Sequence, residues 1–398
     1  MKARLVHLNL ATESGDPRMF WLIASNLKKQ NWDVSVACAY FDEKVFPDLR
    51  GDIRVSVFAS GKISYYSSGS NIYREVWSRV TRKMLSIWHV FLISKQSFDG
   101  IDMLVCQNDD SYILGKILKR RYPGLKVVWV MNNAPYFSSS KKNIFVKIGS
   151  LIAAAVEYIQ ARWAISGVDL VVVHDKEREA LAKKITQRVE LLPIPVEYDK
   201  FFSIPRASSD SAKPFLLLSA GSLSPARSYE DVIDALALLR SKGINVRAEF
   251  ICKNFWKNDS YKNFLEKRVL QGGLALGEDV IFHYQGLPDP EFVSLFHRGD
   301  AFIFPNRQNI WGMAPMEAMA AGMPLLVSAS SSVAEIVEDG KTALIFPAGD
   351  IHKLAELILT LIKNPELRFK IAKAGQSFVK ENLCWDVYIK KFIKATGV

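Results

Sequence analysis

The strongest constraint in this sequence is a pattern that occurs twice: short apolar runs rich in β-branched residues alternate with longer stretches of helical periodicity. Strands that are apolar on both faces must be covered on both sides, and strands that alternate with helices form parallel sheets. In the first half, the pattern predicts strands over 3–9, 33–39, 102–107, 126–131, 169–173 and 189–192, and helices over 17–31, 111–121, 142–166 and 176–184. The sequence therefore predicts a doubly wound α/β domain.

The same pattern restarts after residue 214. It predicts strands over 215–220, 246–251, 280–285, 301–304, 324–328 and 343–346, and helices over 229–241, 261–271, 315–321 and 352–363. Residues 197–214 are rich in Ser, Pro, Asp and Lys and have no periodicity, which is typical of a linker. A chain of 398 residues suits two domains. We expect domains at 1–196 and 215–384, with the carboxyl ends of their strands facing each other across a cleft.

The positive charge is concentrated in one region. Residues 1–200 carry 29 Lys and Arg against 20 Asp and Glu, and residues 62–167 alone carry 15 against 6. A basic surface attracts nucleic acid, anionic lipid or an anionic substrate. Because no nucleic-acid-binding motif is present, we expect no nucleic-acid partner. The segments 71–96 and 141–163 are basic, amphipathic and contain Trp, which predicts binding to an anionic membrane surface; alternatively, their aromatic residues belong to the core.

Several features predict a cytoplasmic protein, peripheral on the inner face of the membrane. The N-terminus has no signal-peptide pattern, and the longest apolar stretch, 144–168, is interrupted by charged residues. The four cysteines lack metal-binding spacing and are expected to be free thiols in a reducing compartment. No HExxH, P-loop or GxGxxG motif occurs, so neither a metal nor a nicotinamide cofactor is expected.

The most informative segment runs from Phe304 to Pro324, where a predicted strand precedes a loop through Gly312 and a helix that Pro315 opens. Proline is favoured there, and free N–H groups at a helix start form an anion site when a glycine allows close approach. Glu317 lies within the first turn, where it can accept hydrogen bonds from a polyol beside the anion. A phosphate with an attached ribose has both features. The alternative is that Glu317 only complements the helix dipole.

Residues 312–324 resemble the signature of retaining nucleotide-sugar glycosyltransferases of family 4, whose GT-B fold has two Rossmann-like domains. That signature has two glutamates eight residues apart, followed by Ala-Met-Ala-x-Gly-x-Pro. The resemblance implies that Glu317, matching the second glutamate, binds the ribose of the nucleotide. Asn309 stands at the position of the first glutamate, which in the family contacts the donor sugar. An amide can hydrogen-bond sugar hydroxyls but does not stabilise positive charge as a carboxylate does.

A second matching loop covers residues 220–228. In the family this loop carries an Arg and, five residues later, a Lys, which grip the donor diphosphate. Arg227 matches the Lys, whereas Ser222 stands where the Arg would be. The resemblance implies substrate contacts for Gly221 and Ser222 in this loop. The alternative for Arg227 is a solvent-facing residue at a helix start. The resemblance also implies substrate contacts for the loop that precedes Glu317, at Trp311, Gly312, Met313 and Ala314.

In the first domain, residues 14–18 resemble the Asp-Pro-Arg variant of the family's loop between the first strand and the first helix. The resemblance implies ligand contacts for Gly15 and Arg18, although Asp16 as N-cap would explain the motif without a ligand. Asn133 stands where many relatives have a histidine near the sugar. The final segment, 385–398, resembles the family's last helix, which crosses back to the first domain.

These features predict a retaining hexosyltransferase that moves a sugar from a nucleotide-diphosphate sugar to a glycan or lipid-linked acceptor, as in assembly of cell-surface polysaccharide, lipopolysaccharide or glycolipid. Its catalytic residues would be Asn309, Arg227 and Glu317, with no metal or other cofactor. One alternative keeps the GT-B fold but changes the reaction, to an epimerase or a phosphorylase. Another is a nucleotide- or glycan-binding protein that lost catalysis through Asn309 and Ser222.

Overall fold

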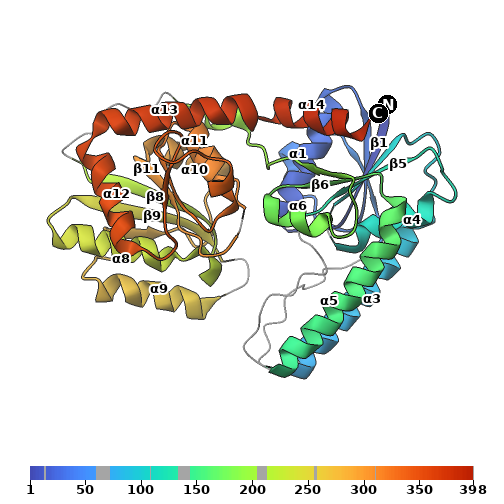
Figure 1. Cartoon of the computed structure of the whole chain (residues 1–398), viewed down its shortest axis with the longest axis horizontal. Helices are drawn as coiled ribbons and strands as arrows, with labels where there is room; N and C mark the ends of the chain where they lie inside the picture. The colour runs from blue at the N-terminus through green and yellow to red at the C-terminus, as the bar shows by residue number, and fades with distance from the viewer. Residues whose placement is uncertain are drawn as a thin grey trace. The chain divides into compact units, whose positions relative to one another are not determined.

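The computed structural model describes residues 1–12, 15–59, 72–107, 109–132, 144–203, 213–254, 258–309 and 311–397. The chain divides into two compact units (Figure 1). The first comprises Met1–Pro193 together with Ile389–Val398, and the second comprises Ile194–Tyr388. The sequence placed the boundary at residue 196 and a linker at 197–214; residues 204–212 of that linker lie outside the described residues.

The first unit contains a seven-stranded parallel sheet with the order β3-β2-β1-β4-β5-β6-β7. Its strands are β1 (Lys2–Leu10), β2 (Asp33–Phe41), β3 (Arg54–Val57), β4 (Met103–Gln107), β5 (Lys126–Val130), β6 (Leu170–Val173) and β7 (Val189–Leu191). The central strands are buried on both faces, as their continuous apolar runs predicted. The sequence analysis missed β3, an edge strand whose side chains are mostly exposed.

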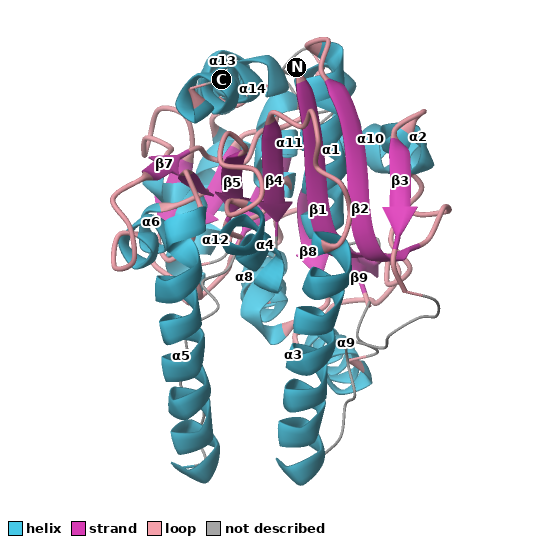
Figure 2. Ribbon diagram, turned by 90° about the vertical axis from the view of Figure 1, so that its right-hand side faces the viewer, coloured by secondary structure: helices cyan, strands magenta, loops and turns pink. Residues whose placement is uncertain are grey.

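The helices of the first unit alternate with its strands along the chain. They are α1 (Gly15–Lys29), α2 (Pro47–Arg50), α3 (Ile72–Ser94), α4 (Ile113–Leu118), α5 (Ile144–Ala164) and α6 (Lys176–Ala182). Side chains of α3, α4 and α5 share one apolar core with alternate residues of β1, β4, β5 and β6. Figure 2 shows α3 and α5 extending well beyond the end of the sheet.

The second unit contains a six-stranded parallel sheet with the order β10-β9-β8-β11-β12-β13. Its strands are β8 (Phe215–Ser222), β9 (Val246–Lys253), β10 (Val280–Phe282), β11 (Ala301–Phe304), β12 (Leu325–Ser328) and β13 (Leu344–Phe346). Successive residues of a strand face opposite sides of the sheet, so Leu217 and Ile303 belong to one apolar core while Leu218 and Phe302 belong to another. Both faces of the sheet are therefore covered.

The helices of the second unit are α7 (Tyr198–Phe201), α8 (Tyr229–Ser241), α9 (Asp259–Gln271), α10 (Asp289–Arg298), α11 (Ala314–Ala320), α12 (Ile351–Lys363) and α13 (Pro365–Asn382). Helix α14 (Trp385–Thr396) follows, and its residues from 389 onward group with the first unit. Among the described helices, none is long and apolar enough to cross a membrane.

Candidate functional site

The second unit places a half-buried cation at the carboxyl end of its sheet. Arg227 ends a 3-10 turn (Pro225–Arg227) that follows β8, and its guanidinium carbon lies 5.5 Å from the centre of the Phe304 ring at the end of β11. Gly221 and Gly312 flank the guanidinium. A Cβ atom added at Gly221 would lie 2.8 Å from Arg227 Nε, and one at Gly312 would lie 3.6 Å from Arg227 Nη1. Three residues that the sequence assigned to donor binding are thus brought together.

The environment of Arg227 suits an anionic ligand. Burial lowers the pKa of its guanidinium, yet an arginine this basic stays protonated at neutral pH. Arg227 Nη1 is buried and has no hydrogen-bond partner among the residues that the structure describes. A buried charged donor without a partner is costly to the fold, and an anion that accepts its hydrogen bonds removes that cost. The expectation of a solvent-facing arginine does not fit this geometry.

Other polar atoms in and after β8 and β11 share this property. Within the described chain, buried atoms without a hydrogen-bond partner occur in Ser219, Ser228, Asn306 and Trp311. Buried polar groups in native proteins are nearly always satisfied by protein, water or ligand. They lie in β8, in the turn before α8 and in the loop after β11, and a polar ligand bound at these segments would satisfy such atoms.

The loop after β11 leads into α11 as the sequence predicted, with Pro315 in the first turn. Glu317 lies in the same turn and is 3% exposed. Asn309 lies earlier in the loop, where its Oδ1 accepts a hydrogen bond from Ser332 Oγ. This contact fixes the amide at the position where the family pattern has a carboxylate.

A bidentate ion pair that the sequence analysis missed fastens this loop to α8. Arg307 Nε lies 3.0 Å from one carboxylate oxygen of Asp231, and Nη2 contacts the other. Asp231 is buried in the first turn of α8, and its hydrogen bond raises the pKa of Arg307. The pair connects the segment that carries Arg227 to the loop that carries Asn309. No local pattern predicts this pair, because its partners are 76 residues apart.

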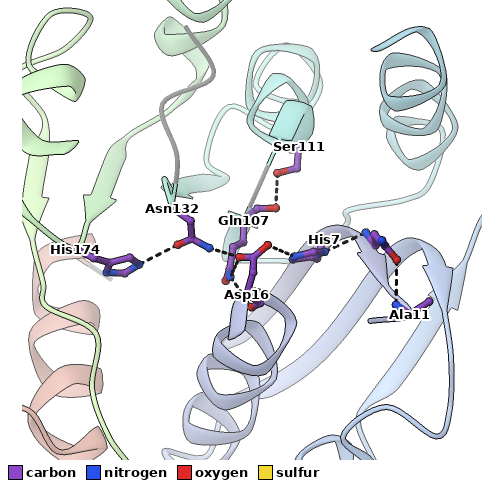
Figure 3. A network of polar contacts seen from close by, with 8 residues as sticks. His7, Ala11, Asp16, Gln107, Ser111, Asn132 and His174 are labelled. Atoms are coloured by element: carbon purple, nitrogen blue, oxygen red, sulfur yellow. Dashed lines mark hydrogen bonds and ion pairs between the residues drawn. The ribbon is translucent and has the colours of Figure 1, made fainter. Parts of the chain in front are cut away.

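The first unit has a polar network at the carboxyl end of its own sheet (Figure 3). His7 Nε2 lies 3.1 Å from Asp16 Oδ2, and Gln107 Nε2 donates to Asp16 Oδ1 over 2.8 Å. Asn132 Nδ2 also donates to Asp16 Oδ1. The expectation that Asp16 is the N-cap is wrong: α1 begins at Gly15, so Asp16 lies inside its first turn, and its carboxylate contacts His7 of β1, Gln107 of β4 and Asn132 after β5. His7, in the buried strand β1, thus holds this carboxylate.

The network continues toward β6. His174 Nε2 lies 3.1 Å from Asn132 Oδ1, and His174 Nδ1 donates to the Leu192 carbonyl over 2.8 Å. Arg178 Nε donates to the carbonyl oxygen of Asn132 over 2.6 Å. Gly15 and Arg18 both lie in the first turn of α1, next to Asp16. Asn133, which the sequence assigned to substrate binding, lies outside the described residues.

Across the described ranges, no group of three or more His, Cys, Asp or Glu side chains is placed to hold a metal ion.

Comparisons with known proteins show which families this chain resembles. Residues 201–378 match the family model of glycosyl transferases group 1. The match spans nearly all of the second unit, including Arg227, Asn309 and Glu317. A glycogen synthase of Mycobacterium tuberculosis is 26% identical over 43% of this chain and 40% of its own length. The chain thus spans less than half the length of this relative. The human α-1,3/1,6-mannosyltransferase ALG2 is 22% identical over 80% of this chain and 77% of its own.

Solved structures show the fold. The whole chain matches the structure of HepE from Anabaena in complex with UDP and glucose, with a TM-score of 0.73. The two are 16% identical, and the match covers 100% of this chain and 99% of that one. This match and the two parallel sheets confirm the predicted GT-B fold.

Proposed function

We propose that this protein is a retaining glycosyltransferase that moves a sugar from a nucleotide-diphosphate sugar to a glycan or lipid-linked acceptor. The observation that carries the proposal is the Arg227 guanidinium between Gly221 and Gly312, whose buried Nη1 has no hydrogen-bond partner among the described residues. The family match over residues 201–378 and the names of the relatives, which are glycosyl-transferring enzymes, support it.

The residues of the second unit have distinct roles in this proposal. Arg227 binds the diphosphate, together with the N–H groups of Gly312, Met313 and Ala314 at the start of α11. Glu317 accepts hydrogen bonds from the ribose, while Asn309 hydrogen-bonds the donor sugar. Gly221, Ser222 and Trp311 complete the surroundings of the donor.

Catalysis then rests mainly on charge stabilisation. Negative charge develops on the departing diphosphate, and a cation already placed in a buried site stabilises it without reorganisation. A phosphate oxygen takes the proton of the acceptor hydroxyl, and the new bond forms on the face that the leaving group vacates. No enzymatic nucleophile is needed. Arg227 supplies the positive charge, so we propose that the reaction uses no metal or other cofactor.

The first unit provides the acceptor side of the reaction. Gly15, Arg18 and Asn133 contact the acceptor or the donor phosphates in this proposal, and the Asp16 network fixes the first turn of α1, which carries Gly15 and Arg18. The acceptor is used in the cytoplasm, on the anionic inner face of a membrane. The unpaired cysteines, three of them buried, suit a reducing compartment.

The test is thermal unfolding of the parent protein with UDP, GDP, ADP and CMP and their sugar derivatives. A ligand at a hundred times its dissociation constant adds about 2.7 kcal/mol to the free energy of unfolding, which shifts the melting temperature by several degrees. We expect one base to stand out, and the response to be lost in Arg227→Gln but kept in the surface control Arg240→Gln.

Transfer is tested separately with the donor identified in this way. Product anomers are assigned by NMR, and retention of the donor's configuration is the expected result. An inverted product would contradict the retaining mechanism. Nucleotide binding without transfer to any glycan or lipid-linked acceptor would favour the binding protein suggested by Asn309 and Ser222.

A further inference from the structure

Exposed apolar side chains are concentrated on α3 and α5. Fifteen large apolar side chains are exposed among the described residues, and nine of them lie on these two helices. Scattered apolar residues on a surface need no explanation, but a cluster marks an interaction site. Figures 1 and 2 both show the two helices extending from the sheet of the first unit.

The exposed residues of α3 form one stripe. It consists of Met84, Ile87, Trp88 and Phe91, which are between 42% and 66% exposed. At about 100° per residue, these four side chains fall within an arc of roughly 100°. Val90 and Ile93, on the other side of the helix, are buried in the core of the first unit.

The exposed residues of α5 form a second stripe. Val156, Ile159 and Trp163 are 57%, 68% and 51% exposed, and their spacing places them within an arc of about 60°. Ala161 and Ala164 face the same core as Val90 and Ile93 of α3.

A polar seam between the helices shows that the two stripes face the same side. Lys83 of α3 pairs with Asp110 and lies 3.8 Å from Glu157 of α5, while Gln160 of α5 donates to Asp110 over 2.7 Å. On each helix, the apolar stripe lies roughly 90–100° around the helix axis from the seam residues of that helix. The rotation from seam to stripe is clockwise on one helix and anticlockwise on the other. Because both helices lead toward strands of one parallel sheet, they run in the same direction. The seven side chains therefore form one apolar face.

Basic side chains accompany the aromatic residues of this apolar face. Lys95 Nζ lies 4.6 Å from the centre of the Phe91 ring, and Lys116 Nζ lies 5.9 Å from that of Trp163. Arg162, beside Trp163, is exposed. Across the two helices the sequence has six Lys and Arg against two Glu, and Glu157 is near Lys83. Aromatic rings flanked by cations fit the headgroup layer of an anionic bilayer.

We propose that the apolar face of α3 and α5 docks on an anionic lipid surface, with its Trp and Phe rings among the headgroups and the neighbouring cations against lipid phosphates. This inference deepens the membrane part of the proposed function by assigning it to these two helices. A protein surface or a second copy of this chain fits the basic flanks less well, because it would need a complementary acidic rim.

The test compares sedimentation with vesicles of phosphatidylcholine and phosphatidylglycerol against vesicles of phosphatidylcholine alone, at low salt. Ile159→Glu is the test variant, and Leu270→Glu on α9 is its matched control, since the two side chains are 68% and 64% exposed on helices. We expect the parent and Leu270→Glu to bind anionic vesicles only. Ile159→Glu should lower the partition coefficient about tenfold or more.

Three results would overturn the proposal: no binding of the parent to anionic vesicles, equal binding to neutral ones, or equal loss in both variants. A dimer that dissociates in Ile159→Glu, without vesicle binding, would assign the face to a second copy. An unfolding curve followed by circular dichroism, compared with that of the parent, tests whether Ile159→Glu is folded. The nucleotide thermal shift is measured on the same samples, so failure of the donor-site proposal is seen separately from failure of docking.

Discussion

Gly221→Ala tests the proposed donor site, because the added methyl group displaces the Arg227 side chain without removing it. The added Cβ would lie 2.8 Å from Arg227 Nε and 3.1 Å from both Arg227 Cζ and the Tyr229 hydroxyl. The first distance is too short for any real contact, so the guanidinium must move, and it is the mobile end of a flexible side chain. The free energy of unfolding should therefore change by less than about 1 kcal/mol.

Ligand affinity should respond much more strongly. A charge-assisted hydrogen bond to a phosphate contributes about 1.5–3 kcal/mol, and each 1.4 kcal/mol is a factor of about ten. We expect the dissociation constant of the nucleoside diphosphate to rise between about tenfold and about a hundredfold. Isothermal titration calorimetry measures the affinity, and urea unfolding measures the stability.

The matched control is Gly124→Ala, because a Cβ at that position meets no atom within 4 Å. It should leave both the affinity and the stability unchanged. Combining Gly221→Ala with Arg227→Gln should give little further loss, since both variants remove the same interaction. Parental affinity in Gly221→Ala, with stability retained, would refute the placement of the diphosphate against Arg227.

Three further predictions concern Glu317, Asp231 and Asp16. Glu317→Gln should weaken nucleoside diphosphate binding by about tenfold while leaving inorganic diphosphate binding unchanged, as calorimetry would show. Asp231→Asn should lower the free energy of unfolding by about 1–2 kcal/mol in urea, because it weakens the ion pair that holds the loop of Arg307. Burial alone would raise the pKa of Asp16, but the charge of His7 and hydrogen bonds from His7, Gln107 and Asn132 lower it overall. The stability that this carboxylate contributes is thus present above pH 3.8 and lost as the pH falls through its lowered pKa. At pH 7, the free energy of unfolding of Asp16→Asn should be lower than that of the parent by roughly 1–3 kcal/mol, and this difference should disappear in acid. A gap independent of pH would contradict this.

The fold was predictable because periodicity is a local property of the sequence. Continuous apolar runs such as 103–106 and 170–173 are buried on both faces, and this pattern alone indicates a covered parallel sheet. Strand β3 was missed because its short, mostly exposed sequence lacks that run. Strand β10 ends at Phe282 and not at residue 285, since the chain turns before Gly286, which has a φ of 76°.

The candidate site was predictable only where a local motif marks it. Arg227, Gly312 and Glu317 lie in segments with a glycine or a proline at a strand-to-helix junction, and these segments can be recognised without knowing their partners. The contacts of Asp16 with Gln107 and Asn132 join residues 91 and 116 positions apart. Which polar side chains meet at such distances depends on strand order, and a single sequence does not specify it.

The two departures from the family pattern have different structural meanings. Asn309 has a defined partner in Ser332, so its amide is held in place and a glutamate there would need a different arrangement. Ser222 leaves Arg227 as the cation of its loop, but the residue paired with Ser222 in the sheet is Lys253, at the end of β9. Paired residues of neighbouring parallel strands point to the same face of the sheet. The side chain of Lys253 therefore leaves the sheet beside position 222, where the family has an arginine. With Ser222 in place of the arginine, the second positive charge near this edge of the sheet belongs to Lys253. The substitution at 222 does not by itself indicate loss of the proposed donor site.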